Sequence, residues 1–306
     1  MALRALYDVA APAKVNLFLH VVGRRADGYH LLQSLFVLID WCDTLHVERR
    51  DDGRLVRHDL GMPLPADDLC LRAARALQTA SACALGCDLS IDKQLPSGAG
   101  LGGGSSDAAS TLLALNRLWR LNWPRSRLAD LALGLGADVP FLLGHAAAIV
   151  EGIGERVTPI TLPTQWLAIV KPAASLDTRS IFASPLLGGS PEVAIIEGFF
   201  EGGAGAMSGR IDAVRGDSIR ADALWDFGRN DLQAAAEARC PEVAQAAGLL
   251  RQAFGNSRMT GSGSAVFARA GTAELPLGAL PASLPSGWSG RMCRSLDAHP
   301  LAGWAE

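Results

Sequence analysis

Apolar residues recur along the chain with two different periods, which predict strands in some places and helices in others. Residues 13–22 alternate well enough to form a strand, and this strand places Lys14, Asn16 and Phe18 on one face. Further apolar runs, with a polar turn at residues 51–53, indicate antiparallel strands and hairpins. These runs cover residues 31–39, 35–41, 44–48 and 55–58.

Helical spacing is clear over residues 69–80, which follow Asp67 and Asp68, two residues of a type that caps helices. Residues 187–209 are rich in glycine and alanine and are expected to form a mobile or variable loop. The chain beyond about residue 283 receives no assignment. Other predicted helices cover residues 108–121, 126–133, 230–238 and 242–254, with a helix or turn at 178–182, and other strands cover residues 90–95, 146–150, 155–159 and 166–170.

The chain is 306 residues long, which suits two domains better than a single core. The character of the sequence changes near residue 161, so we expect one domain over residues 1–160 and a second over residues 161–306. The composition is 49% hydrophobic and 19% charged, which is typical of a globular protein.

The charge distribution and the amino-terminal residues indicate which partners and which location to expect. The net charge is −3 and the pI is about 6.1, and no run of Lys and Arg is long enough for a nucleic-acid or membrane patch. Arg4, Asp8 and Lys14 interrupt the amino-terminal residues, so no signal-peptide core is expected and the location is predicted to be cytoplasmic. A small-molecule substrate fits this picture, and the oligomeric state stays open between a monomer and a weak homodimer.

The most distinctive stretch is residues 95–109, which hold five glycines and three serines between a strand-like run and a run with helical spacing. Glycine leaves the backbone bare, so such a loop can approach a ligand closely. Where a loop runs into a helix, the first amides and the helix dipole attract an anion. Ser105, Ser106 and Asp107 are good N-cap types and mark the expected helix start. The stretch therefore predicts a phosphate-binding loop.

Two other phosphate-binding patterns fit this loop poorly. A P-loop needs a lysine after its last glycine, and here Ser105 follows Gly104. A dinucleotide fingerprint can be drawn through Gly98, Gly100 and Gly103, but no acidic residue ends a strand about 20 residues later. A flexible linker is a further alternative, although a linker is not expected to lie between apolar runs.

Two single residues add candidate chemistry. The chain carries 25 arginines but only three lysines, so Lys14 near the start of the first strand is a candidate for a specific ammonium role. Asp138 lies in an apolar segment between a glycine and a proline, where a buried carboxylate is costly unless it is paired. The alternatives are a solvated lysine on an edge strand and an aspartate that caps a turn.

Four segments together resemble the GHMP kinases, the superfamily of galactokinase, homoserine kinase and mevalonate kinase, in their order and spacing. They are residues 12–16, 96–109, 135–140 and 260–264. The resemblance implies an α+β, two-domain GHMP kinase fold: an ATP-binding domain like domain 2 of ribosomal protein S5, then a ferredoxin-like C-terminal domain, with the site in the cleft between them. Two departures are mild, since Ala99 stands where the loop often has glycine and Ser262 and Ser264 replace other small residues.

The resemblance also implies roles for individual residues. Lys14 and Asp138 correspond to the catalytic pair, with Asp138 accepting the proton of the substrate hydroxyl. ATP is the implied co-substrate, and Mg²⁺ would arrive with it, without an evident protein ligand. The implied ATP-binding residues are Pro96, Ser97, Gly98, Ala99, Gly100, Leu101, Gly102, Gly103, Gly104, Ser105 and Ser106. The implied substrate-binding residues are Asn16, Tyr29, His30, Thr178, Phe182, Gly261, Ser262 and Gly263.

Residues 25–30, Arg-Ala-Asp-Gly-Tyr-His, resemble one subfamily that phosphorylates the 2-hydroxyl of a cytidine-diphosphate-linked methylerythritol in non-mevalonate isoprenoid synthesis. Tyr29 and Phe182 resemble the aromatic residues that hold its cytosine. Two alternatives stay open. One is a homoserine- or mevalonate-type kinase, whose smaller substrate needs no aromatic residues to hold a base. The other is a catalytically silent relative that binds a ligand.

Overall fold

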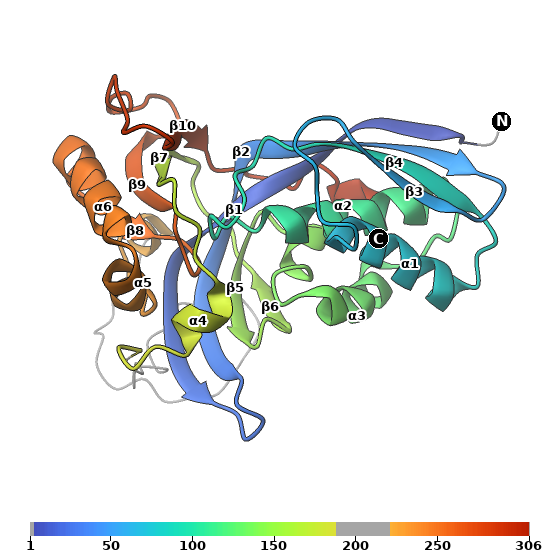
Figure 1. Ribbon diagram of the computed structural model, residues 1–306, viewed down its shortest axis with the longest axis horizontal. Helices are drawn as coiled ribbons and strands as arrows, with labels where there is room; N and C mark the ends of the chain where they lie inside the picture. Colours follow the sequence, from blue (N-terminus) through green and yellow to red (C-terminus); the bar gives the residue numbers. More distant parts are fainter. Residues whose placement is uncertain (1–2, 188–220, 306) are drawn as a thin grey trace.

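The structure is a computed structural model that describes residues 3–187 and 221–305. The loop expected over residues 187–209 lies outside these residues, apart from Leu187. The described chain forms two sheets with helices packed on each, and the two halves lie side by side (Figure 1).

The first half is built on a six-stranded sheet with the order β3-β4-β2-β5-β6, in which β1 also pairs with β2. Two long antiparallel strands run through it, β1 (Ala5–Arg24) and β2 (His30–Arg50). The sequence divides β2 into three shorter runs, but one strand forms because β5 pairs with its first part and β4 with its second. The other strands are β3 (Leu55–Asp59), β4 (Gly86–Asp92), β5 (Ala147–Gly152) and β6 (Arg156–Pro159).

The hairpin expected at residues 51–53 is wrong. β3 pairs in parallel with β4 and is separated from β2. A parallel pair needs a crossover, and α1 (Leu69–Ser81) supplies it between β3 and β4. The predicted N-cap of α1 is confirmed for Asp68, whose side chain accepts hydrogen bonds from the amides of Cys70 and Leu71.

Helices α1, α2 (Gly103–Leu118) and α3 (Arg125–Leu135) cover one face of this sheet (Figure 1), and the short η1 (Phe141–Leu143) packs beside α2. The helix start expected at Ser105 to Asp107 is wrong, because the N-cap is Gly102. Gly102 has a φ of 72°, a conformation that glycine adopts without steric cost, so the helix begins directly at the end of the glycine loop.

The second half holds a four-stranded antiparallel sheet with the order β10-β7-β9-β8. The edge strand β10 falls in the segment that the sequence left unassigned. Helix α6 packs on this sheet and against α5 (Figure 1). The strands are β7 (Gln165–Lys171), β8 (Arg258–Met259), β9 (Val266–Thr272) and β10 (Ser289–Arg294), and the helices are α4 (Thr178–Phe182), η4 (Ala221–Trp225), α5 (Gln233–Arg239) and α6 (Pro241–Phe254).

The last residues of the described chain return to the first half, where η5 (Ala302–Trp304) packs against α2. Leu301 and Ala305, on either side of η5, are buried in the core formed by the first sheet and its helices. Another core lies between the two sheets and joins them. The predicted α+β class is confirmed, and its strands form two sheets.

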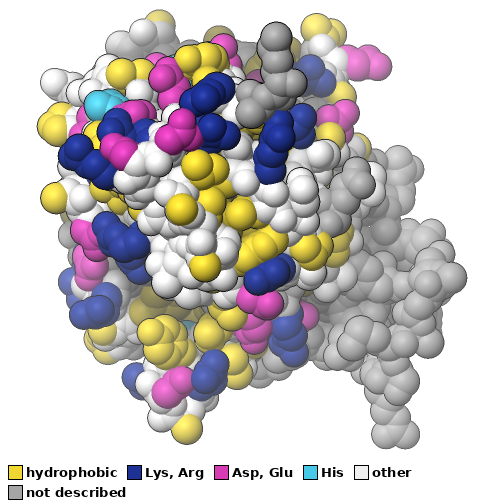
Figure 2. Space-filling model, turned by 90° about the vertical axis from the view of Figure 1, so that its right-hand side faces the viewer, with side chains coloured by type: hydrophobic (Ala, Val, Ile, Leu, Met, Phe, Trp, Pro, Cys, Tyr) yellow, Lys and Arg dark blue, Asp and Glu magenta, His cyan; other side chains and the backbone are white. Residues whose placement is uncertain are grey.

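No helix among the described residues is long and apolar enough to cross a membrane. On the face seen in Figure 2, acidic and basic side chains are interspersed among small groups of apolar ones.

Candidate active site

Lys14 occupies an irregular part of β1. Register shifts separate Pro12 from Lys14 and Asn16 from Phe18, so the segment with Lys14 and Asn16 is bounded by two irregularities in the pairing with β2. Such bulges re-aim side chains and occur next to active sites. The second shift breaks the expected alternation, and Phe18 packs with His20 and Phe227 in the interior.

The Lys14 ammonium is buried and has three kinds of partner. Its Nζ lies 3.2 Å from Asp138 Oδ2 and donates to Asn16 Oδ1 at 2.6 Å. It also lies 4.7 Å from the centroid of the Phe36 ring, which is a cation–π distance. An ammonium that is 3% exposed needs such partners to be tolerated. The alternative of a solvated lysine on an edge strand is therefore wrong.

Asn16 fixes the other side of the ammonium. Its amide nitrogen donates to Ser34 Oγ at 2.9 Å, and its backbone N–H donates to Thr260 Oγ1, also at 2.9 Å. Ser34 in turn donates to the carbonyl of Phe18. Because each amide atom has a partner, the Asn16 oxygen points to Lys14, and the orientation of the lysine is set from both halves of the molecule.

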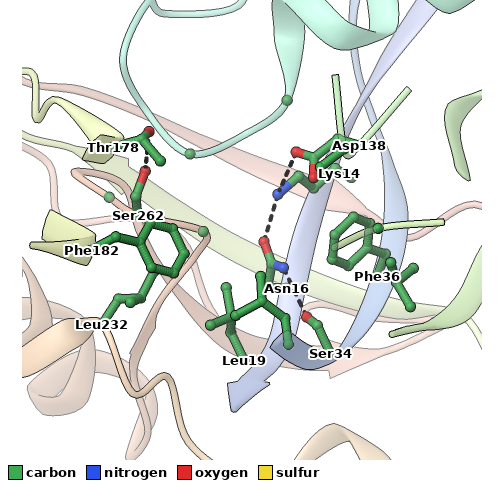
Figure 3. A pocket seen from close by; sticks show the side chains of 18 of the residues that line it. Lys14, Asn16, Leu19, Ser34, Phe36, Asp138, Thr178, Phe182, Leu232 and Ser262 are labelled. Atoms are coloured by element: carbon green, nitrogen blue, oxygen red, sulfur yellow. Dashed lines mark hydrogen bonds and ion pairs between the residues drawn. The ribbon is translucent and has the colours of Figure 1, made fainter. Parts of the chain in front are cut away.

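Asp138 lies in the turn that precedes η1 and reaches the lysine from the opposite side (Figure 3). Its side chain is 31% exposed, so the expectation of a buried carboxylate is wrong: the buried member of the pair is Lys14. The two groups are brought together from positions 124 residues apart only by the packing of α2 and η1 on the sheet. An exposed carboxylate oxygen beside a fixed ammonium can accept a proton from a bound hydroxyl.

The glycine loop packs directly against Lys14. Gly98, Gly100 and Gly102 all have positive φ values, from 61° to 74°. A Cβ on Gly102 would lie 3.1 Å from Lys14 Cε, so the loop backbone approaches the lysine more closely than another residue would allow. The Lys14 amide donates to the carbonyl of Leu101 at 2.9 Å. Ala99 and Leu101 are buried in the core between the sheets and anchor the loop.

The N-terminus of α2 opens onto the same place. The N-cap residue of this helix is Gly102, and no side chain accepts a hydrogen bond from the first amides. These amides are therefore available to an anion. Ser105 is partly exposed, and its hydroxyl faces Gly136, two residues before Asp138. The Ser106 hydroxyl is buried and donates to the Pro12 carbonyl at 2.7 Å, so it is engaged within the fold.

A second glycine loop, residues 260–264, meets the first. Ser264 N donates to the Gly98 carbonyl at 3.2 Å, and Ala265 N donates to the Ala99 carbonyl at 3.0 Å. A Cβ on Gly100 would lie 2.3 Å from the Thr260 carbonyl oxygen. The contact between the two loops therefore requires a bare backbone at Gly100.

These elements enclose a cavity of about 300 Å³ between the two halves. Lys14 and Asp138 lie at one side of the cavity, and Phe182 points in from the other (Figure 3). Beside Phe182, the hydroxyls of Thr178 and Ser262 form a hydrogen bond of 2.7 Å. Predicted site residues on the cavity wall are Lys14, Asn16, Gly98, Gly100, Gly102, Asp138, Thr178, Phe182, Gly261, Ser262 and Gly263.

Comparison with known proteins assigns this arrangement to a family. Residues 68–145 match GHMP kinases N terminal domain, and residues 218–276 match GHMP kinases C terminal. A protein of Methylibium petroleiphilum named 4-diphosphocytidyl-2-C-methyl-D-erythritol kinase is 61% identical to this chain, with all of both chains covered. This chain belongs to the GHMP kinase family.

Solved structures give the same result. A crystal structure of 4-(cytidine 5'-diphospho)-2C-methyl-D-erythritol kinase matches 87% of this GHMP kinase and 89% of its own chain, at 34% identity and a TM-score of 0.66. Homoserine kinase from Cytophaga hutchinsonii covers 97% of this chain and 96% of its own at a TM-score of 0.65, but at 14% identity it shows the shared fold alone. Membership of the family implies ATP as co-substrate, and the glycine cradle beside the open end of α2 fits its phosphates.

Two predicted substrate residues lie away from the cavity wall. Tyr29 is 64% exposed at the turn between β1 and β2. His30 stacks on Phe182, with ring centroids 5.2 Å apart and planes inclined by 25°. Burial, followed by the charge of Arg24, lowers the pKa of His30. The structure thus pairs Phe182 with the residue next to Tyr29.

Several residues of the site carry no signal in the sequence. Phe36 and Ser34 look like ordinary strand residues, but the β1–β2 register sets Phe36 opposite Asn16. Thr260 touches Asn16 across 244 positions of the chain. Thr260 lies within segment 260–264, so the family resemblance is a signal that could have drawn attention to it, although Thr260 is not among the implied site residues. Among the described residues, no group of three His, Cys, Asp or Glu side chains could hold a metal ion.

Proposed function

We propose that this GHMP kinase transfers the γ-phosphoryl group of ATP to the 2-hydroxyl of 4-diphosphocytidyl-2-C-methyl-D-erythritol, giving the 2-phosphate and ADP. The product would serve non-mevalonate isoprenoid precursor synthesis in the cytoplasm. The ion pair between Lys14 and Asp138 at the cavity wall carries the proposal of phosphoryl transfer. The substrate rests on the name shared by relatives of 50% to 61% identity.

In the proposed reaction Asp138 orients the acceptor hydroxyl and takes its proton as the oxygen attacks. Lys14 pairs with that carboxylate at 3.2 Å and would face the negative charge that develops on the transferred group. Asn16 and Phe36 hold the ammonium in place, so no reorganisation is needed during transfer. Phosphoryl transfer depends mainly on such positioning and charge stabilisation.

We assign phosphate binding to the loop from Pro96 to Ser105 within residues 1–160. The amides at the start of α2 and the bare backbone at Gly98, Gly100 and Gly102 would hold the phosphates, and Mg²⁺ carried by ATP would offset part of the phosphate charge. The fit rests on the positive φ values and on the absence of a side-chain cap at Gly102.

We assign the cytidyl end of the acceptor to the aromatic group formed by Tyr29, His30 and Phe182, together with Thr178 and the loop from Gly261 to Gly263 in residues 161–306. Phe182 already lines the cavity and makes one ring stack. Tyr29 presents an exposed ring at the adjacent turn, where a planar base would gain a second aromatic contact. Stacking of this kind is worth about 1–3 kcal/mol per base.

Coupled release of ADP tests the proposal directly. The purified chain is given ATP and Mg²⁺ with 4-diphosphocytidyl-2-C-methyl-D-erythritol, homoserine or mevalonate, each in a separate reaction. We expect turnover with the cytidyl substrate alone. Turnover with homoserine or mevalonate instead would retain the kinase and overturn the substrate, whereas no turnover with any of them would favour a ligand-binding relative without catalysis.

A further inference from the structure

A buried cluster of three charged residues lies beneath the phosphate loop. Lys93 follows β4, Asp43 lies on β2, and Asp107 lies in the second turn of α2. The Lys93 ammonium donates to Asp107 Oδ2 at 2.6 Å and also to Asp43 Oδ2. The three side chains are 7%, 3% and 0% exposed for Lys93, Asp107 and Asp43. A ligand in the cavity cannot reach groups buried to this extent.

The cluster joins the two ends of the loop. Asp43 Oδ1 accepts hydrogen bonds from the amides of Gln94 and Leu95, at 2.6 and 2.7 Å, where the loop begins. Through Lys93 the same carboxylate is linked to Asp107, just beyond the point where the loop ends. The start of α2 also packs here, since a Cβ on Gly103 would lie 3.3 Å from Leu95 Cβ. One ammonium thus joins the two ends of the loop through residues 14 positions apart.

The cluster is expensive to bury. Two carboxylates face one ammonium, and Asp107 Oδ1 is buried with no hydrogen-bond partner in the described structure. Burial raises the pKa of Asp107 to about 7, even though Lys93 opposes the shift. Replacing such groups by apolar ones is often neutral or stabilising, so stability alone is a weak reason to keep them. A carboxylate close to the phosphate site would also repel the phosphates, so direct ligand binding does not explain it.

We propose that Asp43, Lys93 and Asp107 form a brace that holds the phosphate loop in its nucleotide-binding shape before ATP arrives. A loop with five glycines loses much conformational entropy when it is ordered. Because the brace orders the loop during folding, the loop loses less conformational entropy when ATP binds, and the affinity for ATP is higher. The three are positioning residues that act through the loop backbone. This inference rests on ATP as the co-substrate and adds to the proposed function.

Direct binding of ATP with Mg²⁺, followed by calorimetry, tests the brace. Asp107→Ala removes the link to α2, and we expect the dissociation constant for ATP to rise about tenfold. Asp107→Asn keeps an oxygen that accepts from Lys93, and we expect a rise of no more than about threefold. The KM for the acceptor should stay unchanged in both variants, because the brace contacts only the phosphate loop and its flanking elements.

Asp59→Asn is the matched control. Arg57 pairs with Asp59 at 2.7 Å and with Asp68 at 2.9 Å, so this second cluster also has one cation between two carboxylates, at the edge strand β3. We expect Asp59→Asn to lower stability and leave ATP binding within about twofold of the native value, because a change in packing away from the loop does not alter its order. An unchanged ATP dissociation constant in Asp107→Ala, or an equal rise in the control, would overturn the proposal.

A second measurement covers the case in which Asp107→Ala does not fold. Hydrogen exchange of the peptide spanning residues 94–104 is compared, with no nucleotide present, between the native chain and Asp107→Leu, which fills the volume of Asp107 with an apolar side chain but accepts no hydrogen bond from Lys93. Faster exchange in this peptide, with unchanged exchange in α6, supports the brace; equal exchange in the loop refutes it. Neither readout uses the acceptor, so a failure of the proposed substrate in the ADP assay leaves this test intact.

Discussion

Lys14 and Asp138 form an ion pair in which the lysine is buried and the aspartate is 31% exposed. The asymmetry matters because the ammonium is fixed by Asn16 and Phe36, whereas the carboxylate keeps an open side toward the cavity. A rigid cation behind an accessible base is the arrangement that proton abstraction from a bound hydroxyl requires.

Asp138→Asn should therefore abolish most of the turnover. The amide keeps the shape of the side chain but cannot accept the proton, and we expect kcat to fall by about 10²- to 10⁴-fold while the KM for ATP changes little. Steady-state ADP release measures both parameters. Asp130→Asn, at an exposed position on α3, is the control and should behave as the native chain. Near-normal kcat in Asp138→Asn would remove this carboxylate from the mechanism.

Gly100→Ala should disrupt the junction of the two glycine loops. The new Cβ would lie 2.3 Å from the Thr260 carbonyl oxygen, and the φ of 74° disfavours any side chain. We expect a loss of stability of about 2 kcal/mol or more, together with a large rise in the KM for ATP. Urea unfolding and steady-state kinetics measure the two effects.

Gly248→Ala is the control, because it makes the same substitution at a glycine with free space around it. Gly248 lies within α6, and a Cβ there meets no atom within 4 Å. Because alanine is the better helix former, we expect a gain of about 0.5–1 kcal/mol and unchanged kinetics. If both variants changed stability by the same amount and in the same direction, the close contact at Gly100 would not be the cause.

Phe182→Ala should weaken binding of the cytidyl substrate. The ring lines the cavity and stacks with His30, so its removal takes away one aromatic face from the base site. We expect the KM for 4-diphosphocytidyl-2-C-methyl-D-erythritol to rise about tenfold or more, with the KM for ATP nearly unchanged. Phe182→Tyr keeps the aromatic face and should retain a KM close to the native value. Equal KM values for Phe182→Ala and the native chain would place the base elsewhere.

His299 should make the stability of the protein sensitive to acid. Burial, together with the nearby charges of Arg125 and His145, lowers the pKa of this residue to about 4. Since the pKa in the folded protein lies below the ordinary histidine value of 6.5, the neutral form stabilises the fold above about pH 6.5, and this contribution is lost as the pH falls toward 4. We expect a loss of roughly 2 kcal/mol between pH 7.5 and 5 from this group.

The variant His299→Asn isolates that contribution. The His299 ring nitrogen Nδ1 accepts from the Leu301 amide at 3.0 Å, and the asparagine oxygen can replace this acceptor without gaining a charge in acid. Urea unfolding at the two pH values should show a smaller loss for the variant than for the native chain. An equal loss in both proteins would contradict the prediction.

The sequence indicated much of the local structure. The helical spacing of residues 69–80 and the capping residue Asp68 both predict α1 correctly, because the amphipathic face and the cap are local properties. The start of α2 was predicted wrongly because it depends on more than the local sequence. Ser105 and Ser106 are good capping residues, but a glycine with positive φ lets α2 begin earlier. Lys14, which approaches from β1, leaves little room for a side chain at Gly102.

Which charged side chains are buried could not be predicted from the sequence, for a different reason. Asp138 lies among apolar residues and was expected to be buried, but it is partly exposed, whereas Asp43, Asp107 and Asp231 are buried. Burial depends on which surfaces of the sheet, α2 and the glycine loop meet, and one apolar neighbourhood in the sequence does not reveal this.

The sequence by itself determined the chemistry that this protein carries: a glycine loop between a strand and a helix, one lysine at a strand start and one aspartate after a glycine, in an order that resembles a kinase family. Only the tertiary structure decided which of these groups meet. Lys14 and Asp138 are joined by the packing of η1 and α2 on the sheet, and Thr260 reaches Asn16 across the two halves. Residue type and spacing act locally, whereas a site between two sheets depends on long-range contacts that form only when both cores have packed.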